Sequence, residues 1–276
     1  MFKLKYLGWQ MQSKILAGIR VLVTRPVHQI QALCDMLEET GARAVCLPLI
    51  AIEPIPVSQQ VETQLRQLSQ ISFAIFISPN AVEYGLEKLR SLGAIPKTLK
   101  LVAIGQASAL KIQQILGRTA DIYPRDQYNT EALLALDDLQ ANYVNHKHII
   151  IFRGCGGREL LSDSLKQRGA IVSYAEVYQR IKPQYEAQQL ANIWTKQPPD
   201  VITLTSNEGL MNLVSLLDGQ YWQQVRQTPL VVVTEKMARN AKKIGFKNTI
   251  LIANKASNQA LLDSVLKWAK INTQSI

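Results

Sequence analysis

The chain alternates short, β-rich apolar runs with longer segments whose apolar positions recur at helical spacing. The runs predict strands at residues 19–24, 43–49, 72–77, 100–104, 147–152, 170–178, 200–204, 229–233 and 248–252. Two of the segments between them carry an apolar stripe typical of a buried helix face: Ile30, Leu33, Cys34 and Leu37, and Leu210, Leu213, Val214 and Leu217. This order predicts an α/β fold built on parallel sheets with helices on both faces.

The sequence also contains an internal repeat at a constant offset of 128 residues. Landmarks of the first copy recur in the second: Arg25 as Arg153, Gly41-Ala42 as Gly169-Ala170, Ser78 as Ser206, Gly117 as Gly245, and Leu133-Leu134 as Leu261-Leu262. Because all of these pairs share one spacing, the repeat indicates two copies of one module, and therefore two similar α/β lobes.

Several glycines stand where a helix is predicted to end before a strand begins: Gly41, Gly117, Gly169 and Gly245. A left-handed residue closes many helices, and glycine adopts that conformation at little cost. We therefore expect these glycines to be structural. Residues 48–56 and their counterpart 176–183 are extended and bounded by proline, which is typical of paired linkers between two lobes.

Composition excludes several classes of protein. Of the 276 residues, 47% are hydrophobic and 19% are charged, so the chain can bury a core and is not intrinsically disordered. Its apolar runs are far shorter than the roughly 20 residues of a membrane span, and we expect no membrane association. Cys34, Cys46 and Cys155 are too few and too scattered for a disulfide framework or a metal clip, which favours the reducing cytoplasm.

The N-terminal residues carry lysines but have neither a continuous apolar core nor a small-residue cleavage site, so they do not fit a signal peptide. We interpret residues 1–14 as an N-terminal extension, with Met11 as an alternative to Met1 as the start. Both copies of the repeat lie in the chain that follows.

The balance of charge favours an acidic ligand. The chain has 31 Lys and Arg against 21 Asp and Glu, a formal net charge of +10, which suits a polyanionic partner. The basic residues are spread along the sequence, and neither an aromatic-basic run nor a zinc finger occurs. We therefore expect an acidic small molecule and not a nucleic acid.

Candidate binding residues lie in the turns that follow the predicted strands, because ligands of open α/β sheets bind beyond the carboxyl ends of the strands, where helix N-termini offer free amides. These turns are Thr24-Arg25-Pro26, Ser78-Pro79-Asn80, Gly105-Gln106-Ala107-Ser108, Arg153-Gly154-Cys155-Gly156-Gly157, Thr205-Ser206-Asn207 and Thr234-Glu235-Lys236. Ser78 and Ser206 fit helix capping as well as ligand binding. Arg25 and Arg153 fit either bidentate binding of carboxylates or a solvated surface.

Recognisable catalytic motifs are scarce. The loop GCGGRE matches neither GxGxxG nor a P-loop, so it indicates only a general cradle for an anion and supports no nucleotide. Of the histidines His28, His146 and His148, the last two fit a hydrated strand edge better than a metal site. There is no GxSxG elbow and no carboxylate pair with a persuasive spacing. An enzyme of this kind would act largely by positioning its substrate.

The order of several short motifs carries a resemblance: VTRP, LPLIAIEP, FISPNAV, VAIGQASA, RGCGGRELLSDSLKQRGA, VYQR and LTSNEGL. Over residues 18 to 270 the chain resembles the uroporphyrinogen-III synthase family. The resemblance implies two α/β lobes joined by a two-stranded β connector, with the first βα unit in the lobe that the C-terminal half completes. The implied boundaries are residues 15–47 plus 184–276 for lobe one, 48–53 and 176–183 for the connector, and 54–175 for lobe two.

The reaction that this resemblance implies is the cyclisation of hydroxymethylbilane, a linear tetrapyrrole polycarboxylate, to uroporphyrinogen III. Water is lost and ring D is inverted through a spiro intermediate, in tetrapyrrole (haem) biosynthesis. The substrate supplies both the electrophile and the nucleophile, so no metal or cofactor is implied, and catalysis by orientation suffices. The resemblance further implies a cytoplasmic monomer, with transient contact to the preceding enzyme of the pathway.

The site residues implied by the resemblance lie in the turns described above. The backbone amides and side chains expected to hold the carboxylate arms are Ser78, Asn80, Gly105, Gln106, Thr205, Ser206, Asn207 and Thr234, with Arg25 and Arg153 assisting. Tyr178 in the VYQR segment matches a connector tyrosine of the family. It can donate a proton to the departing hydroxyl or simply pack between the lobes.

Two further observations leave alternatives open. Glu208 places an acidic residue where an anion is expected, although an acid also favours a helix N-terminus. A non-catalytic bilobal module that binds an anion would share the repeat, the linkers and the amide donors. A nucleotide-dependent transferase is disfavoured, because the glycine fingerprints of nucleotide sites are missing.

Overall fold

The chain divides into two compact units in a computed structural model that describes residues 15–217 and 219–273. Unit 1 comprises Met1–Ala51 and Ile181–Ile276, and unit 2 comprises Ile52–Arg180. The predicted N-terminal extension, residues 1–14, lies outside the described residues. No helix among the described residues is both long and apolar enough to cross a membrane.

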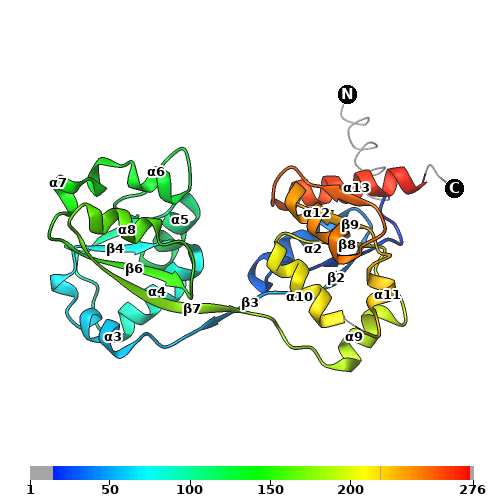
Figure 1. Cartoon of the computed structure of the whole chain (residues 1–276), viewed down its shortest axis with the longest axis horizontal. Helices are drawn as coiled ribbons and strands as arrows, with labels where there is room; N and C mark the ends of the chain where they lie inside the picture. Colours follow the sequence, from blue (N-terminus) through cyan, green and yellow to red (C-terminus); the bar gives the residue numbers. More distant parts are fainter. Residues whose placement is uncertain (1–14, 218, 274–276) are drawn as a thin grey trace. The chain divides into compact units, whose positions relative to one another are not determined.

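Unit 1 is built on a parallel sheet of order β10-β9-β8-β1-β2. Figure 1 labels β2, β8 and β9 of this sheet. Its strands are β1 (Arg20–Val23), β2 (Arg43–Cys46), β8 (Val201–Thr203), β9 (Leu230–Val232) and β10 (Ile250–Ile252). Strand β1 pairs with β8 in the register Val21↔Val201. The first βα segment therefore shares a sheet with the strands of the C-terminal part of the chain.

Helices cover both faces of the unit 1 sheet, as side-chain alternation along its strands requires. Leu22 faces α9 (Ala187–Trp194), α10 (Asn207–Leu217), α11 (Trp222–Val225) and α12 (Glu235–Ile244). Val21 and Val23 point to the other face, where α2 (Val27–Glu39) and α13 (Asn258–Thr273) pack. The predicted stripe of α2 is buried, and in α10 Val214 is half-buried while the other stripe residues are buried.

Unit 2 has the sheet order β3-β7-β6-β4-β5, and the pairs β7–β6, β6–β4 and β4–β5 are parallel. Its strands are β3 (Ala51–Pro54), β4 (Phe73–Phe76), β5 (Lys100–Ala103), β6 (His148–Gly154) and β7 (Ile171–Ile181). Its helices are α3 (Gln59–Leu65), η1 (Leu68–Gln70), α4 (Pro79–Leu92), α5 (Gln106–Leu116), α6 (Thr130–Leu134), η2 (Asp137–Leu139), α7 (Ala141–Val144) and α8 (Leu160–Gln167).

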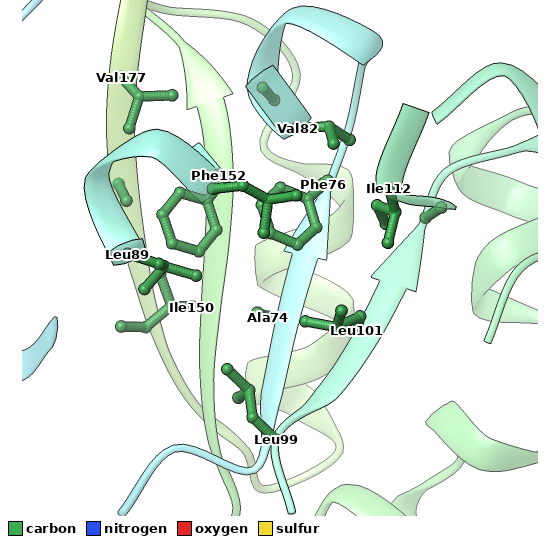
Figure 2. Packing of buried hydrophobic residues seen from close by; sticks show 14 of the residues in the cluster. Ala74, Phe76, Val82, Leu89, Leu99, Leu101, Ile112, Ile150, Phe152 and Val177 are labelled. Carbon is green, nitrogen blue, oxygen red and sulfur yellow. The ribbon is translucent and has the colours of Figure 1, made fainter. Parts of the chain in front are cut away.

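A pair of phenylalanines lies at the centre of one face of the unit 2 sheet. Phe76 and Phe152 are fully buried on adjacent strands, and their rings stack with centroids 4.8 Å apart (Figure 2). Helix α4 approaches this pair so closely that a Cβ on Gly85 would lie 2.7 Å from Phe152 Cδ1. Glycine at that position therefore lets the helix pack directly on the ring pair that supports the strands.

The structure confirms the predicted α/β fold with two similar, largely parallel sheets, and it has a strand at every predicted location. The glycines expected to close helices all have positive φ: Gly41 at 87°, Gly117 at 68°, Gly169 at 84° and Gly245 at 115°. Strand β3 overlaps residues 48–53, which the resemblance implied as a connector strand, and it is hydrogen-bonded to β7 at the edge of the unit 2 sheet. The two-stranded connector stays a prediction.

Candidate functional site

The predicted residues of unit 2 lie at the carboxyl ends of adjacent strands. Ser78 and Asn80 follow β4, Gly105 and Gln106 follow β5, Arg153 is near the end of β6, and Tyr178 is on β7. Parallel strands bring their carboxyl ends to one edge of a sheet. The structure therefore gathers these residues at a single edge of unit 2.

A pocket of about 290 Å³ opens at this edge. It is lined by Ile77, Ser78, Gly154, Cys155, Gly156, Gly157, Tyr178 and Arg180, all within unit 2. Two of the predicted residues, Ser78 and Tyr178, form part of its wall. Gly105, Gln106, Asn80 and Arg153 are not among the lining residues.

Tyr178 is held from three sides. Its phenol oxygen lies 3.1 Å from Ser78 Oγ, and either hydroxyl can donate the hydrogen bond. Its ring packs on Gly154 so tightly that a Cβ there would lie 2.6 Å from Tyr178 Cε2. The ring of Tyr84 is the third neighbour, with a centroid distance of 6.1 Å. Tyr178 lines the pocket although only 4% of its surface is exposed.

The local backbone explains this placement of the tyrosine. The register of β6 and β7 shifts between Arg153 and Gly154, so that Gly154 is opposite Tyr178. The amide of Cys155 donates to the carbonyl of Tyr178 at 2.9 Å, which continues the pairing past the shift. Irregularities of this kind redirect side chains at the ends of strands. Here the shift brings the glycine loop and the phenol together.

Ser78 has two roles at once. It is the N-cap of α4, because its Oγ accepts a hydrogen bond from the amide of Ala81 at 3.0 Å, and Pro79 occupies the first turn. The same oxygen contacts the phenol of Tyr178. The capping role considered from the sequence is confirmed, and it fixes the hydroxyl that Tyr178 needs as a partner.

Arg153 is buried inside unit 2, with 2% of its surface exposed. Its Nη1 donates to Glu159 Oε1 at 3.0 Å, and its guanidinium lies over the ring of Tyr174 at 4.4 Å. Tyr174 in turn donates to the other carboxylate oxygen of Glu159 at 2.6 Å. The hydrogen bond from Tyr174, and second that from Arg153, lowers the pKa of Glu159. This network ties Arg153 to the segment that follows the glycine loop.

Cys155 lines the pocket; it belongs to one of the candidate turns but was not among the site residues predicted individually. Burial, and second the charge of Glu176, raises the pKa of its thiol, so the thiol is neutral near pH 7 and a weak nucleophile. Glu176 also accepts the amide of Gly156 at 3.1 Å. The glycine-rich loop was the signal in the sequence, but its glycines were considered only as a general anion cradle.

At the start of α5 a tyrosine covers the helix N-terminus. Tyr128 donates to Gln106 Oε1 at 2.9 Å, and a Cβ on Gly105 would lie 2.6 Å from Tyr128 Cβ. Glycine at 105 therefore permits the close approach of this ring. The side chain of Gln106 is engaged within unit 2, while Asn80 is half-buried in the first turn of α4.

Arg25 is the predicted residue of unit 1 that follows β1, and it is buried with 8% exposed. Its guanidinium donates to Asn258 Oδ1 and to the carbonyl of Ala256, at the start of α13. Within the described part of the chain its Nε is buried without a hydrogen-bond partner. Burial lowers the pKa of Arg25.

The remaining predicted residues of unit 1 begin helices. Ser206 Oγ accepts from the amide of Gly209 at 2.9 Å, and Thr234 Oγ1 caps α12 through the amide of Met237 at 3.2 Å. Asn207 Oδ1 accepts from Asn240 at 2.9 Å, and Thr205 is half-buried in the turn before α10. These turns lie at the carboxyl ends of β8 and β9, which are neighbours in the sheet.

Comparison with known proteins gives concordant matches. A protein-family model described as uroporphyrinogen-III synthase HemD matches residues 31–263. The uroporphyrinogen-III synthase of Escherichia coli (strain K12) is 33% identical over 244 residues, covering 88% of this chain and 98% of that protein. The protein of that name from Salmonella typhimurium (strain LT2) is 34% identical over 245 residues, with the same coverage of 88% and 98%.

Solved structures match the fold as well. Uroporphyrinogen-III synthetase from Helicobacter pylori 26695 aligns with a TM-score of 0.59, 15% identity, and coverage of 91% of this chain and 99% of that one. A mutant uroporphyrinogen III synthase from the extremely thermophilic bacterium Thermus thermophilus aligns with a TM-score of 0.53, 15% identity, and coverage of 92% and 100%. At this identity the structural matches show a shared fold.

Proposed function

We infer that this chain, which belongs to the uroporphyrinogen-III synthase family, is a cyclising lyase that converts hydroxymethylbilane to uroporphyrinogen III. The reaction removes water and inverts ring D, and it belongs to tetrapyrrole (haem) biosynthesis. A non-catalytic anion-binding module would need no hydroxyl pair at its pocket. Both the family match and the hydroxyl pair of Tyr178 and Ser78 favour the enzyme over the non-catalytic module.

One observation carries the chemistry that we propose: the hydroxyl pair of Tyr178 and Ser78 in the wall of the unit 2 pocket. When Ser78 donates to the phenol oxygen, the phenol proton is available to a group in the pocket. We assign to Tyr178 the transfer of this proton to the substrate hydroxyl as its C–O bond breaks and water leaves. The proton that ring D loses at the end of cyclisation returns to the phenolate. The phenol is thereby regenerated, and the net change in the substrate is the loss of one water molecule.

The rest of the proposal concerns binding. The carboxylate arms are held by backbone amides of the strand-to-helix turns, and Arg25 and Arg153 support these turns from inside their own units. Because the substrate supplies both the electrophile and the nucleophile, the protein needs to favour only one geometry of ring closure. We further propose that the chain acts as a cytoplasmic monomer that takes its substrate from the preceding enzyme.

The decisive experiment is an assay with freshly generated hydroxymethylbilane that separates type III from type I product. The wild-type chain is expected to give type III product, whereas unassisted ring closure gives type I. If the purified chain binds the substrate yet leaves only type I product, the proposed function is wrong.

Substitution Tyr178→Phe tests the role of the phenol separately. Loss of a general acid typically costs about a hundredfold or more in kcat, so we expect a fall of that size and a shift toward type I product. Tyr84→Phe is the matched control, because Tyr84 packs against the same ring but lies outside this pocket, and its rate should stay close to wild type. An unchanged rate for Tyr178→Phe would assign Tyr178 to packing alone.

A further inference from the structure

Unit 1 has a pocket of its own at the opposite edge of its sheet from the predicted substrate residues. This pocket of about 460 Å³ is lined by Arg20, Arg43, Asn192, Lys196 and Gln197, and we call it the basic pocket. Arg20 and Arg43 are the first residues of β1 and β2, whereas the predicted substrate residues follow the last residues of their strands. The basic pocket is therefore outside the machinery described above.

The two arginines of the basic pocket stand side by side. Arg20 and Arg43 are register partners on neighbouring parallel strands, and strands in a sheet lie about 4.8 Å apart. Like charges placed opposite each other destabilise a sheet. Arg43 Nη1 donates to Gln197 Oε1 at 3.0 Å, a neutral partner that adds no negative charge.

The guanidinium of Arg20 also has donors without hydrogen-bond acceptors among the described residues. Among residues 15–217 and 219–273, no group accepts a hydrogen bond from its Nε or Nη1, although both atoms are buried. Asp200 uses Oδ2 to accept the backbone amide of Arg20 at 2.7 Å. Burial, and second the charge of Arg43, lowers the pKa of Arg20, and Asp200 opposes this less strongly. These two donors are closed off from solvent, but the positive charge of the guanidinium is not neutralised within the described part of unit 1 and favours an anion at the pocket.

The internal repeat provides a comparison within the same molecule. At the offset of 128 residues, Arg20, Arg43 and Lys196 correspond to His148, Ile171 and Leu68. The unit 2 counterpart is a pocket of about 100 Å³ that also lies beside His148 and Ile171 and is bordered by Gln64, the equivalent of Asn192. His148 and Ile171 are register partners as well. The fold thus forms a hollow there in both units, but it does not require the three cations.

We propose that the basic pocket of unit 1 binds a small phosphate-bearing molecule. Guanidinium groups bind phosphate oxygens in a bidentate manner, and a phosphate monoester carries about −1.5 to −2 charges at neutral pH. That charge matches the surplus of three cations over Asp200 better than a single carboxylate does. Asn192 and the amide nitrogen of Gln197 add neutral donors, and the volume leaves room for an organic group beyond the phosphate.

The test is calorimetric titration of the full chain with inorganic phosphate and with a pentose 5-phosphate, at constant ionic strength. We expect saturable binding of at least the ester to the wild type. Arg20→Gln/Arg43→Gln should weaken it about tenfold or more, the effect of losing one charged hydrogen bond. Arg43→Gln alone, on an exposed side chain, should weaken it in the same direction and keep wild-type cyclisation activity, which shows that the fold is intact.

Lys243→Gln is the matched control, because it removes one exposed positive charge from α12 of the same unit, away from the basic pocket. Its affinity should equal that of the wild type. Citrate serves as the carboxylate probe and should bind more weakly than the ester. The proposal is overturned if neither phosphate probe binds, if the double variant binds as well as the wild type, or if citrate binds at least as tightly.

Discussion

At the residue scale, the side chains singled out for binding are more enclosed than the sequence suggests. Arg25 and Arg153 were expected to offer their guanidinium groups to a ligand, with a solvated surface as the alternative. Both are buried and hydrogen-bonded inside their own units. Asn258, the partner of Arg25, lies 233 residues away along the chain, so no local pattern identifies it, whereas Glu159 is only six residues beyond Arg153.

Tyr178, in contrast, lines the pocket that its prediction as a site residue requires. The resemblance of the VYQR segment singles it out, and the structure places it at the pocket beside Ser78. Its contact with Gly154 depends on the register shift between β6 and β7. Hydrophobic periodicity carries no information about such a shift, because one irregular residue leaves the apolar pattern of both strands intact.

A prediction at this scale concerns Cys34, whose Sγ lies 2.9 Å from that of Cys46. Burial, and second the hydrogen bond with Cys46, raises the pKa of Cys34 from 9.0 to about 12. The thiol in the unfolded chain therefore releases its proton at a lower pH than the thiol in the folded chain. The protonated Cys34 thiol thus contributes fully to the free energy of unfolding below pH 9, and this contribution is lost as the pH rises toward 12.

Urea unfolding of the reduced protein across this window checks the prediction. The free energy of unfolding should fall more steeply with pH for the wild type than for Cys34→Ala. The tyrosines that also titrate there are common to both proteins and cancel in the difference. Parallel curves would show that Cys34 titrates alike in the folded and unfolded chain.

At the scale of elements, apolar runs were sufficient to predict the strands, because a parallel strand buried on both faces is apolar throughout. The apolar pattern indicated only an extended linker at β3, which is bounded by proline and pairs at a sheet edge, and the resemblance alone implied a connector strand at residues 48–53. Strand β7 runs on to Ile181, beyond the predicted end at residue 178. The extension includes Arg180, which lines the pocket together with Tyr178.

The N-cap of α4 allows a test that separates stability from catalysis. Ser78→Ala removes the acceptor of the Ala81 amide and the partner of Tyr178. We expect a loss of about 0.5–2 kcal/mol in the free energy of unfolding, together with a lower share of type III product. Denaturant unfolding and the product assay measure the two effects.

Ser58→Ala is the matched control for this cap. Ser58 caps α3 through the amide of Val61 at 3.3 Å, and it is not a residue of the candidate site. Its substitution should cost a similar free energy of unfolding without altering the product ratio. If both variants shift the ratio equally, the effect belongs to general destabilisation.

At the scale of the whole molecule, the repeat predicted two similar lobes, but the assignment of the first βα segment came from the family resemblance. Apolar spacing does not show which sheet a strand joins, since β1 would fit next to either β8 or β6. The pairing Val21↔Val201 settles the point in the structure. Unit 2 is consequently one continuous segment, and unit 1 is made of two.

This arrangement predicts different behaviour for the two units in isolation. A fragment of residues 50–183 contains all strands of the unit 2 sheet and both of its buried faces. We expect it to fold with dispersed amide NMR signals and a cooperative unfolding transition. It should lack cyclisation activity, because Arg25 and the turns of unit 1 are missing. A fragment that stays unfolded would show that unit 2 depends on the rest of the chain.

The split of unit 1 also affects the protein while it emerges from a ribosome. Strands β1 and β2 leave the exit tunnel well before β8, the other neighbour of β1 in the sheet, which is more than 150 residues further on. At translation rates of roughly 5–20 residues per second, the apolar face of the nascent β1–α2–β2 segment waits on the order of ten seconds or more for its partner. Chaperones and proteases therefore have their main opportunity at the β1–α2–β2 segment of the newborn polypeptide.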